Sequence, residues 1–207
     1  MQTSQTILLK KRPKGKPSLE DFEFTHTEIP TLKEGEVLLK SLYLSVDPYL
    51  RGRMSNAPSY IAPFEVGQAL ESGIVAEVLE SKAAGLSAGD YVFGALAWKE
   101  VQVKDAHKLT KVDPKIAPLS AYLGVLGLTG LTAYLGMMEI GKPKKGETLL
   151  VSGAAGAVGS IVGQIGKILG MHVVGIAGSD EKLALMQSKF GFDAGINYKT
   201  TENMREA

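Results

Sequence analysis

Residues 148–159 read TLLVSGAAGAVG, and this stretch decides the fold of the carboxyl-terminal part of the chain. The run TLLVS (148–152) has the length and apolar character of a buried strand. Glycines stand at every third position of the turn that follows: Gly153, Gly156 and Gly159. Residues 160–169 then place apolar side chains at helical spacing, which predicts a helix that starts near Ala157.

The pattern continues downstream, with a strand, a helix and a strand predicted over His172–Ile176, Glu181–Phe190 and Ala194–Asn197. Strands that alternate with helices form parallel sheets through right-handed crossovers, so this part is predicted to be an α/β unit. A doubly wound sheet has six strands in the order 3-2-1-4-5-6, and the sequence supplies three of them. One edge of strand 148–152 would then lack a partner, leaving Leu149, Leu150 and Val151 partly solvated. We therefore expect a longer protein, or another element that covers this edge.

The three glycines suit a turn around the pyrophosphate of a dinucleotide. One glycine makes the tight turn, one lets the backbone approach the phosphates, and one lets the helix pack on the strand. The helix that begins near Ala157 would offer free N–H groups and the positive end of its dipole to the phosphates. The alternative is a glycine-rich turn that holds no ligand.

The residues after the second strand indicate which dinucleotide would bind. An NAD site has an acidic side chain there for the ribose 2′-hydroxyl, whereas an NADP site has room and positive charge. Here Ile176 is followed by Ala-Gly-Ser, and Ser179 is predicted to be the N-cap of the next helix. Lys182 falls at the third helical position, where a cation is unfavourable for the helix but would suit a 2′-phosphate. NADP is favoured, although Asp180 leaves NAD open.

The first half of the chain has a different pattern of predicted secondary structure. Short strands are predicted over Glu36–Ser45, Gly73–Glu80, Tyr91–Phe93 and Glu100–Lys104. Strands without long helices between them favour an antiparallel, barrel-like unit. The basic residues between Lys10 and Lys16 are predicted to lie in a solvated hairpin or loop. Two domains are therefore expected, residues 1–125 and residues 126–207.

Composition excludes several classes of protein. The 207 residues are 44% hydrophobic and 22% charged, as in globular proteins, and the net charge of +1 offers no attraction to nucleic acid or an anionic membrane. The absence of cysteine excludes disulfides, thiolate nucleophiles and cysteine-ligated zinc. Since His26, His107 and His172 also lack ligand spacing, no metal site is predicted. The amino terminus has no signal-peptide pattern, so a soluble, cytoplasmic protein is expected.

Residues 116–138 carry no charge and are long enough to span a bilayer. However, four glycines weaken a continuous helix, and serine, threonine and tyrosine residues dilute its apolar character. Two short buried helices with close backbone contacts are predicted instead.

Several segments together resemble one protein family: LSVDPYLRGRM (44–54), GLTAYLGMMEIG (130–141), VSGAAGAVGSIVGQIGK (151–167), VVGIAGSDEK (173–182) and FDAGINYKT (192–200). They are similar to the zinc-independent medium-chain dehydrogenase/reductase proteins, in the branch of prostaglandin reductase and alkenal/one (double-bond) reductases. The resemblance implies a GroES-like barrel followed by a Rossmann domain. The family's members are longer than this chain.

The resemblance also implies roles for particular residues. The family's phosphate loop falls on Gly156, Ala157, Val158 and Gly159, and its 2′-phosphate lysine falls on Lys182. Its adenosine-side tyrosine matches Tyr198, and its substrate-pocket tyrosine, in the D-P-Y motif, matches Tyr49. The family's enol-stabilising tyrosine would lie beyond residue 207, so no catalytic residue is assigned.

The resemblance implies an NADPH-dependent enzyme that reduces the C=C bond of α,β-unsaturated aldehydes and ketones. Without a metal to polarise a carbonyl, hydride would be added to the β-carbon, which conjugation already makes electrophilic. An NADPH:quinone oxidoreductase of the same superfamily and a non-catalytic NADPH-binding protein are the alternatives. The expected partner is a small enal or enone substrate, and the expected assembly is a homodimer.

Overall fold

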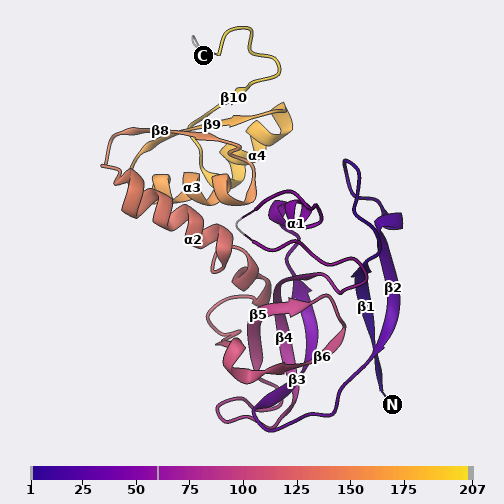
Figure 1. Ribbon diagram of the computed structural model, residues 1–207. Coiled ribbons are helices and arrows are strands. Elements are labelled where there is room, and N and C mark those ends of the chain that lie inside the picture. Colours follow the sequence, from indigo (N-terminus) through magenta and orange to yellow (C-terminus); the bar gives the residue numbers. More distant parts are fainter. Residues whose placement is uncertain (1, 60, 205–207) are drawn as a thin grey trace. The chain divides into compact units, whose positions relative to one another are not determined.

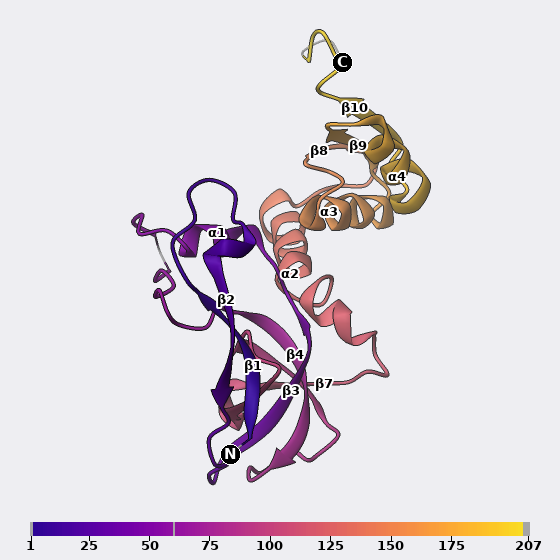
Figure 2. The same cartoon turned by 90° about the vertical axis from the view of Figure 1, so that its right-hand side faces the viewer.

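The computed structural model describes residues 2–59 and 61–204. The chain divides into two compact units, Met1–Leu123 and Gly124–Ala207, whose α-helices and strands are labelled in Figures 1 and 2. The predicted domain boundary after residue 125 stays a prediction. Each unit is described by itself.

The first unit is built from antiparallel strands. Its main sheet has the order β6-β3-β4-β5-β7. These strands are β3 (Glu36–Leu44), β4 (Glu71–Ser81), β5 (Tyr91–Ala97), β6 (Val101–Asp105) and β7 (Thr110–Val112). Among the described residues, short helices accompany them: η1 (Leu19–Asp21), α1 (Pro48–Arg53), η2 (Ala106–Lys108) and η3 (Leu119–Leu123). Alternate residues of β3, β4 and β5 point into one buried cluster, which includes Val37, Leu39, Ile74, Ala76, Val78, Val92 and Leu96, as expected for strands with one buried face.

A second antiparallel pair, β1 (Thr3–Leu9) and β2 (Phe22–Glu28), completes this unit. The basic residues from Lys10 to Lys16 lie in the connection between these two strands, as predicted. Arg51 of α1 holds this connection, because its guanidinium donates hydrogen bonds to the backbone oxygens of Pro13 and Gly15 at 3.0 and 2.8 Å.

The second unit contains a parallel sheet with the order β10-β9-β8. Its elements are α2 (Leu128–Leu135), the π-helical turn η4 (Gly136–Gly141), β8 (Thr148–Ser152), α3 (Ala157–Ile168), β9 (His172–Ala177), α4 (Asp180–Phe190) and β10 (Ala194–Asn197). Strands and helices alternate from β8 to β10, as predicted. The fold class, an antiparallel GroES-like unit followed by a Rossmann-type parallel sheet, is confirmed.

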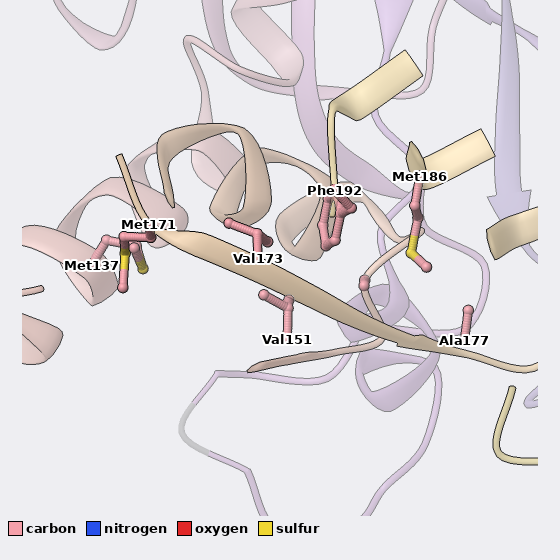
Figure 3. Packing of buried hydrophobic residues seen from close by; sticks show 8 residues of the cluster. Met137, Val151, Met171, Val173, Ala177, Met186 and Phe192 are labelled. Carbon is pink, nitrogen blue, oxygen red and sulfur yellow. The ribbon is translucent and has the colours of Figure 1, made fainter. Parts of the chain in front are cut away.

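The core of the second unit lies along β9. In Figure 3 the labelled side chains run from Met137 and Met171 at one end of this strand to Ala177 and Met186 at the other. Val151 of β8 belongs to the same cluster and is only 6% exposed, so the expectation that it would be partly solvated is wrong. Side chains alternate along a strand: Val151 faces the core, whereas its neighbour Leu150 points the other way and is 59% exposed.

The uncharged segment 116–138 contains two short helical elements, η3 and α2 with its continuation, as predicted. The predicted close contact is confirmed at Gly130, where a Cβ atom would lie 1.8 Å from the backbone oxygen of Val125. The predicted burial is wrong for η3, which contains no fully buried residue, and for one face of α2. Leu128, Leu131 and Tyr134 recur every three residues, and each is more than half exposed, because the described residues do not cover this face. In the part of the chain that the structure describes, none of the helices has the length and hydropathy needed to cross a membrane.

A charged cluster ties the amino-terminal end of β9 to α3. Lys167 donates to both carboxylate oxygens of Asp193, at 2.6 and 2.7 Å, and the backbone N–H of Val173 donates to one of them at 2.6 Å. The Lys167 ammonium and this N–H lower the pKa of the Asp193 carboxyl below its ordinary value. His172 lies 3.5 Å from the same carboxylate.

Candidate dinucleotide-binding site

A cavity of about 370 Å³ lies where β8 and β9 end. It is lined by Ser152, Gly153, Ala155, Gly156, Ile176, Ala177, Gly178, Lys182 and Tyr198. Ser152 and Ala177 are the last residues of their strands, and Tyr198 directly follows β10. Ligands of open α/β sheets bind at the carboxyl ends of the strands, so this is the position expected of a binding site.

The glycine-rich turn between β8 and α3 forms one wall of the cavity. Gly153 has a φ of +59°, a conformation that favours glycine, and its oxygen accepts a hydrogen bond from Gly156 N–H at 2.9 Å. A Cβ atom at Gly159 would lie 2.5 Å from that same oxygen, so a side chain there would force the helix away from the turn. The turn therefore brings the start of α3 directly to the end of β8.

The first turn of α3 supplies donors that the helix does not use. Gly156 is the N-cap and has no side chain that could accept a hydrogen bond from the N–H groups of the first helical turn. The N–H groups of Ala157, Val158 and Gly159 have no acceptor within the helix. They provide donors and partial positive charge of the kind that binds a phosphate.

Lys182 of α4 and Tyr198, which follows β10, also line the cavity. Ser179 is the N-cap of α4, as predicted, and its Oγ accepts from the Lys182 N–H at 3.4 Å. The Lys182 side chain lines the cavity. Tyr198 lies against Gly178, since a Cβ atom on that glycine would be 2.7 Å from the Tyr198 hydroxyl oxygen. The absence of a side chain at residue 178 thus leaves Tyr198 the space it occupies.

Four of the predicted cofactor-binding residues meet in this cavity: Gly153, Gly156, Lys182 and Tyr198. Of the other four, Ala157, Val158 and Gly159 lie in the first turn of α3, and Ser179 caps α4. Five lining residues were not predicted, namely Ser152, Ala155, Ile176, Ala177 and Gly178. They are small or apolar and lie within the quoted segments 151–167 and 173–182, but no role was assigned to them, although their place at or near the ends of two predicted strands was a usable signal.

Tyr49 belongs to α1 in the first unit and is not among the residues that line this cavity. Its side chain is partly buried against a cluster of Leu9, Leu50, Met54, Phe64 and Leu70. The arginine contacts of α1 described above fix the helix that carries it. Among the described residues, no three histidine, aspartate or glutamate side chains are grouped so that they could hold a metal ion. The predicted lack of a metal site stays a prediction.

Comparison with known proteins identifies relatives. A family profile described as the N-terminal domain of oxidoreductase matches residues 5–112. Prostaglandin reductase 1 of Bos taurus is 46% identical over 210 residues, which cover 100% of this chain and 61% of the relative. The NADP(+)-dependent 2-alkenal reductase of Nicotiana tabacum is 43% identical over 210 residues, covering 99% of this chain and 61% of the relative.

A solved structure agrees with these relatives. The crystal structure of CurA from Vibrio vulnificus in complex with NADPH superimposes with a TM-score of 0.88 at 42% identity, covering 95% of this chain and 58% of that one. The chain thus spans about 60% of the length of the curated relatives it matches. It belongs to the oxidoreductase family that this N-terminal domain defines, in the prostaglandin reductase and alkenal reductase branch of the medium-chain dehydrogenase/reductase superfamily.

Proposed function

We propose that the protein is an NADPH-dependent oxidoreductase that reduces the C=C bond of α,β-unsaturated aldehydes and ketones without a metal. The observation that carries this proposal is the cavity in which the glycine-rich turn and Lys182 face the same space. The names of the relatives, which include a 2-alkenal reductase and prostaglandin reductases, support the reaction type.

The residues of the cavity fit a dinucleotide that carries a 2′-phosphate. Gly156 and Gly159 let the turn pack closely on the start of α3, since a Cβ atom at these positions would lie 3.1 and 2.5 Å from the Gly153 oxygen. The first-turn N–H groups of α3 would hold the pyrophosphate. Lys182 would pair with the 2′-phosphate, and Tyr198 would contact the adenosine. No acidic residue lines the described cavity, whereas an NAD site would place one there for the 2′-hydroxyl.

The cofactor supplies hydride for the β-carbon of the substrate. The described residues bind and orient: the turn and Lys182 hold the nucleotide, and Tyr49 lines the substrate pocket. An oxyanion that forms during such a reaction needs hydrogen-bond donors, each worth about 3–4 kcal/mol where one was removed from another enzyme. No residue of this chain is assigned that role. We further propose a cytoplasmic homodimer that acts on small enals or enones and binds neither nucleic acid nor membrane.

The proposal is tested by NADPH oxidation in the purified full-length protein with 3-nonen-2-one or with benzoquinone, before and after treatment with EDTA and phenanthroline. We expect turnover of the enone that survives both chelators. Faster turnover of the quinone would favour a quinone oxidoreductase, and no turnover with tight NADPH binding would favour a non-catalytic protein. A chelator-sensitive rate that zinc restores would contradict the metal-free reaction.

A further inference from the structure

We propose that Asn197 determines the preference for NADPH over NADH by holding the carboxylate of Asp180 away from the cofactor cavity. This inference rests on the proposed function and assigns Asn197 a positioning role within the same site. It starts from Asp180, the acidic residue that kept NAD as an alternative cofactor in the sequence analysis. Asp180 is the first residue of α4 and comes three residues after the end of β9.

The structure shows a partner for this carboxylate. The side-chain nitrogen of Asn197 donates to Asp180 Oδ1 at 2.7 Å. Asn197 is the last residue of β10 and is only 8% exposed. Asp180 does not line the described cavity, whereas Lys182, two residues further along the same helix, does. The carboxylate is therefore directed to the end of β10.

Asn197 is itself held in one orientation. Its side-chain oxygen accepts from the backbone N–H of Lys199 at 3.1 Å, which leaves the nitrogen to face Asp180. Its backbone oxygen accepts from the N–H groups of Thr200 and Thr201 at 3.1 and 3.0 Å. Because these bonds already fix the Asn197 side chain and backbone, little conformational entropy is lost when its nitrogen binds the Asp180 carboxylate.

The position of this charge decides between the two cofactors. A carboxylate free to turn toward the strand end would accept a hydrogen bond from the 2′-hydroxyl of NADH. The same carboxylate would repel the 2′-phosphate of NADPH. Restraint by Asn197 therefore weakens NADH binding and protects NADPH binding at once. Glu181, the neighbouring acid, makes no such contact among the described residues, so it provides a matched control.

The test measures dissociation constants for NADPH and NADH by cofactor fluorescence in the purified protein, and compares their ratio between variants. Asn197→Ala should lower the preference for NADPH roughly tenfold or more, the scale of one hydrogen bond to a charged group. Asp180→Asn added to Asn197→Ala should restore the preference, because the released charge is gone. Glu181→Gln should leave the ratio of the parent protein unchanged.

A second pair of variants covers the case in which Asn197→Ala does not fold. Asn197→Asp keeps an acceptor for Lys199 N–H, but its carboxylate repels Asp180. Asn197→Asp combined with Asp180→Asn exchanges the two side chains, so that residue 180 donates to residue 197 and the net charge of the parent is kept. We expect the first to lower the ratio and the second to recover it. Equal affinities in the parent would overturn the proposed NADPH function. A selective parent whose ratio survives loss of the Asn197 donor, or is not recovered by Asp180→Asn, would overturn the positioning role alone.

Discussion

Lys182 places its positive charge at the third position of α4, close to the end where the helix dipole is also positive. Asp180 and Glu181 in the same turn carry the charge that suits this position. The lysine therefore costs the helix a small amount of stability. A ligand phosphate in the cavity that Lys182 lines would offset this cost.

Replacement of Lys182 by alanine should reduce the preference for NADPH over NADH by about 1.5–3 kcal/mol, the value of a hydrogen bond to a charged group. The affinity for NADH should change little, because the 2′-hydroxyl does not need the cation. Titration of both cofactors by fluorescence checks this. Lys189→Ala, in the last turn of the same helix, serves as the control, and a loss of the same size there would contradict a specific role for Lys182.

At the scale of the element, α3 is shaped by glycines that let it approach its neighbours. A Cβ atom at Gly163 would lie 2.0 Å from the ring of Phe192, which is 4% exposed in the core. A Cβ atom at Gly166 would lie 2.7 Å from Leu149 of β8. These contacts fix the distance between the helix and the core, and with it the position of the first-turn N–H groups.

Gly163→Ala should lower the free energy of unfolding by about 1–3 kcal/mol, because the methyl group overpacks the core against Phe192. Gly136→Ala is the matched control in the same unit. Gly136 has a helical φ of −58° and nothing within 4 Å of its Cβ position, so alanine should stabilise by roughly 0.4–1 kcal/mol. Urea denaturation measures both. Equal effects of the two substitutions would contradict the close packing of α3 at Gly163 against Phe192.

The sequence predicted most elements of the second unit because their signals are local. Apolar strands, glycines and a serine cap each act within a few residues, and β8 and β10 begin and end where they were predicted to. The strands β1 and β2 were not assigned residue by residue, since TSQTILL and FEFTHTE mix polar and apolar residues. Their pairing depends on contacts with each other along their whole length.

At the scale of the whole molecule, the features missed from the sequence are those that join distant residues. The contact between Asn197 and Asp180 spans seventeen residues, and only the parallel pairing of β10 with β9 brings the two together. The exposed face of α2 was missed for a related reason. Apolar periodicity predicts that a face can be buried, but not which element covers it.

The unpaired edge of β8 is also a feature of the whole molecule. Within the described residues β8 pairs only with β9, and Leu150 is exposed while Leu149 and Val151 face the core. The curated relatives are longer, and the chain spans about 60% of their length. The residues that line the cavity come from the ends of β8 and β9, from the turns that follow these strands, and from Lys182 and Tyr198, and not from the unpaired edge of β8.

The central claim is that this cavity recognises a 2′-phosphate. Isothermal titration of the purified protein with adenosine 2′,5′-bisphosphate and with adenosine 5′-monophosphate tests it most directly, because the two ligands differ only in that phosphate. The account predicts that the bisphosphate binds at least about tenfold more tightly, as one charge-assisted hydrogen bond would provide. Equal affinities for the two ligands would contradict it.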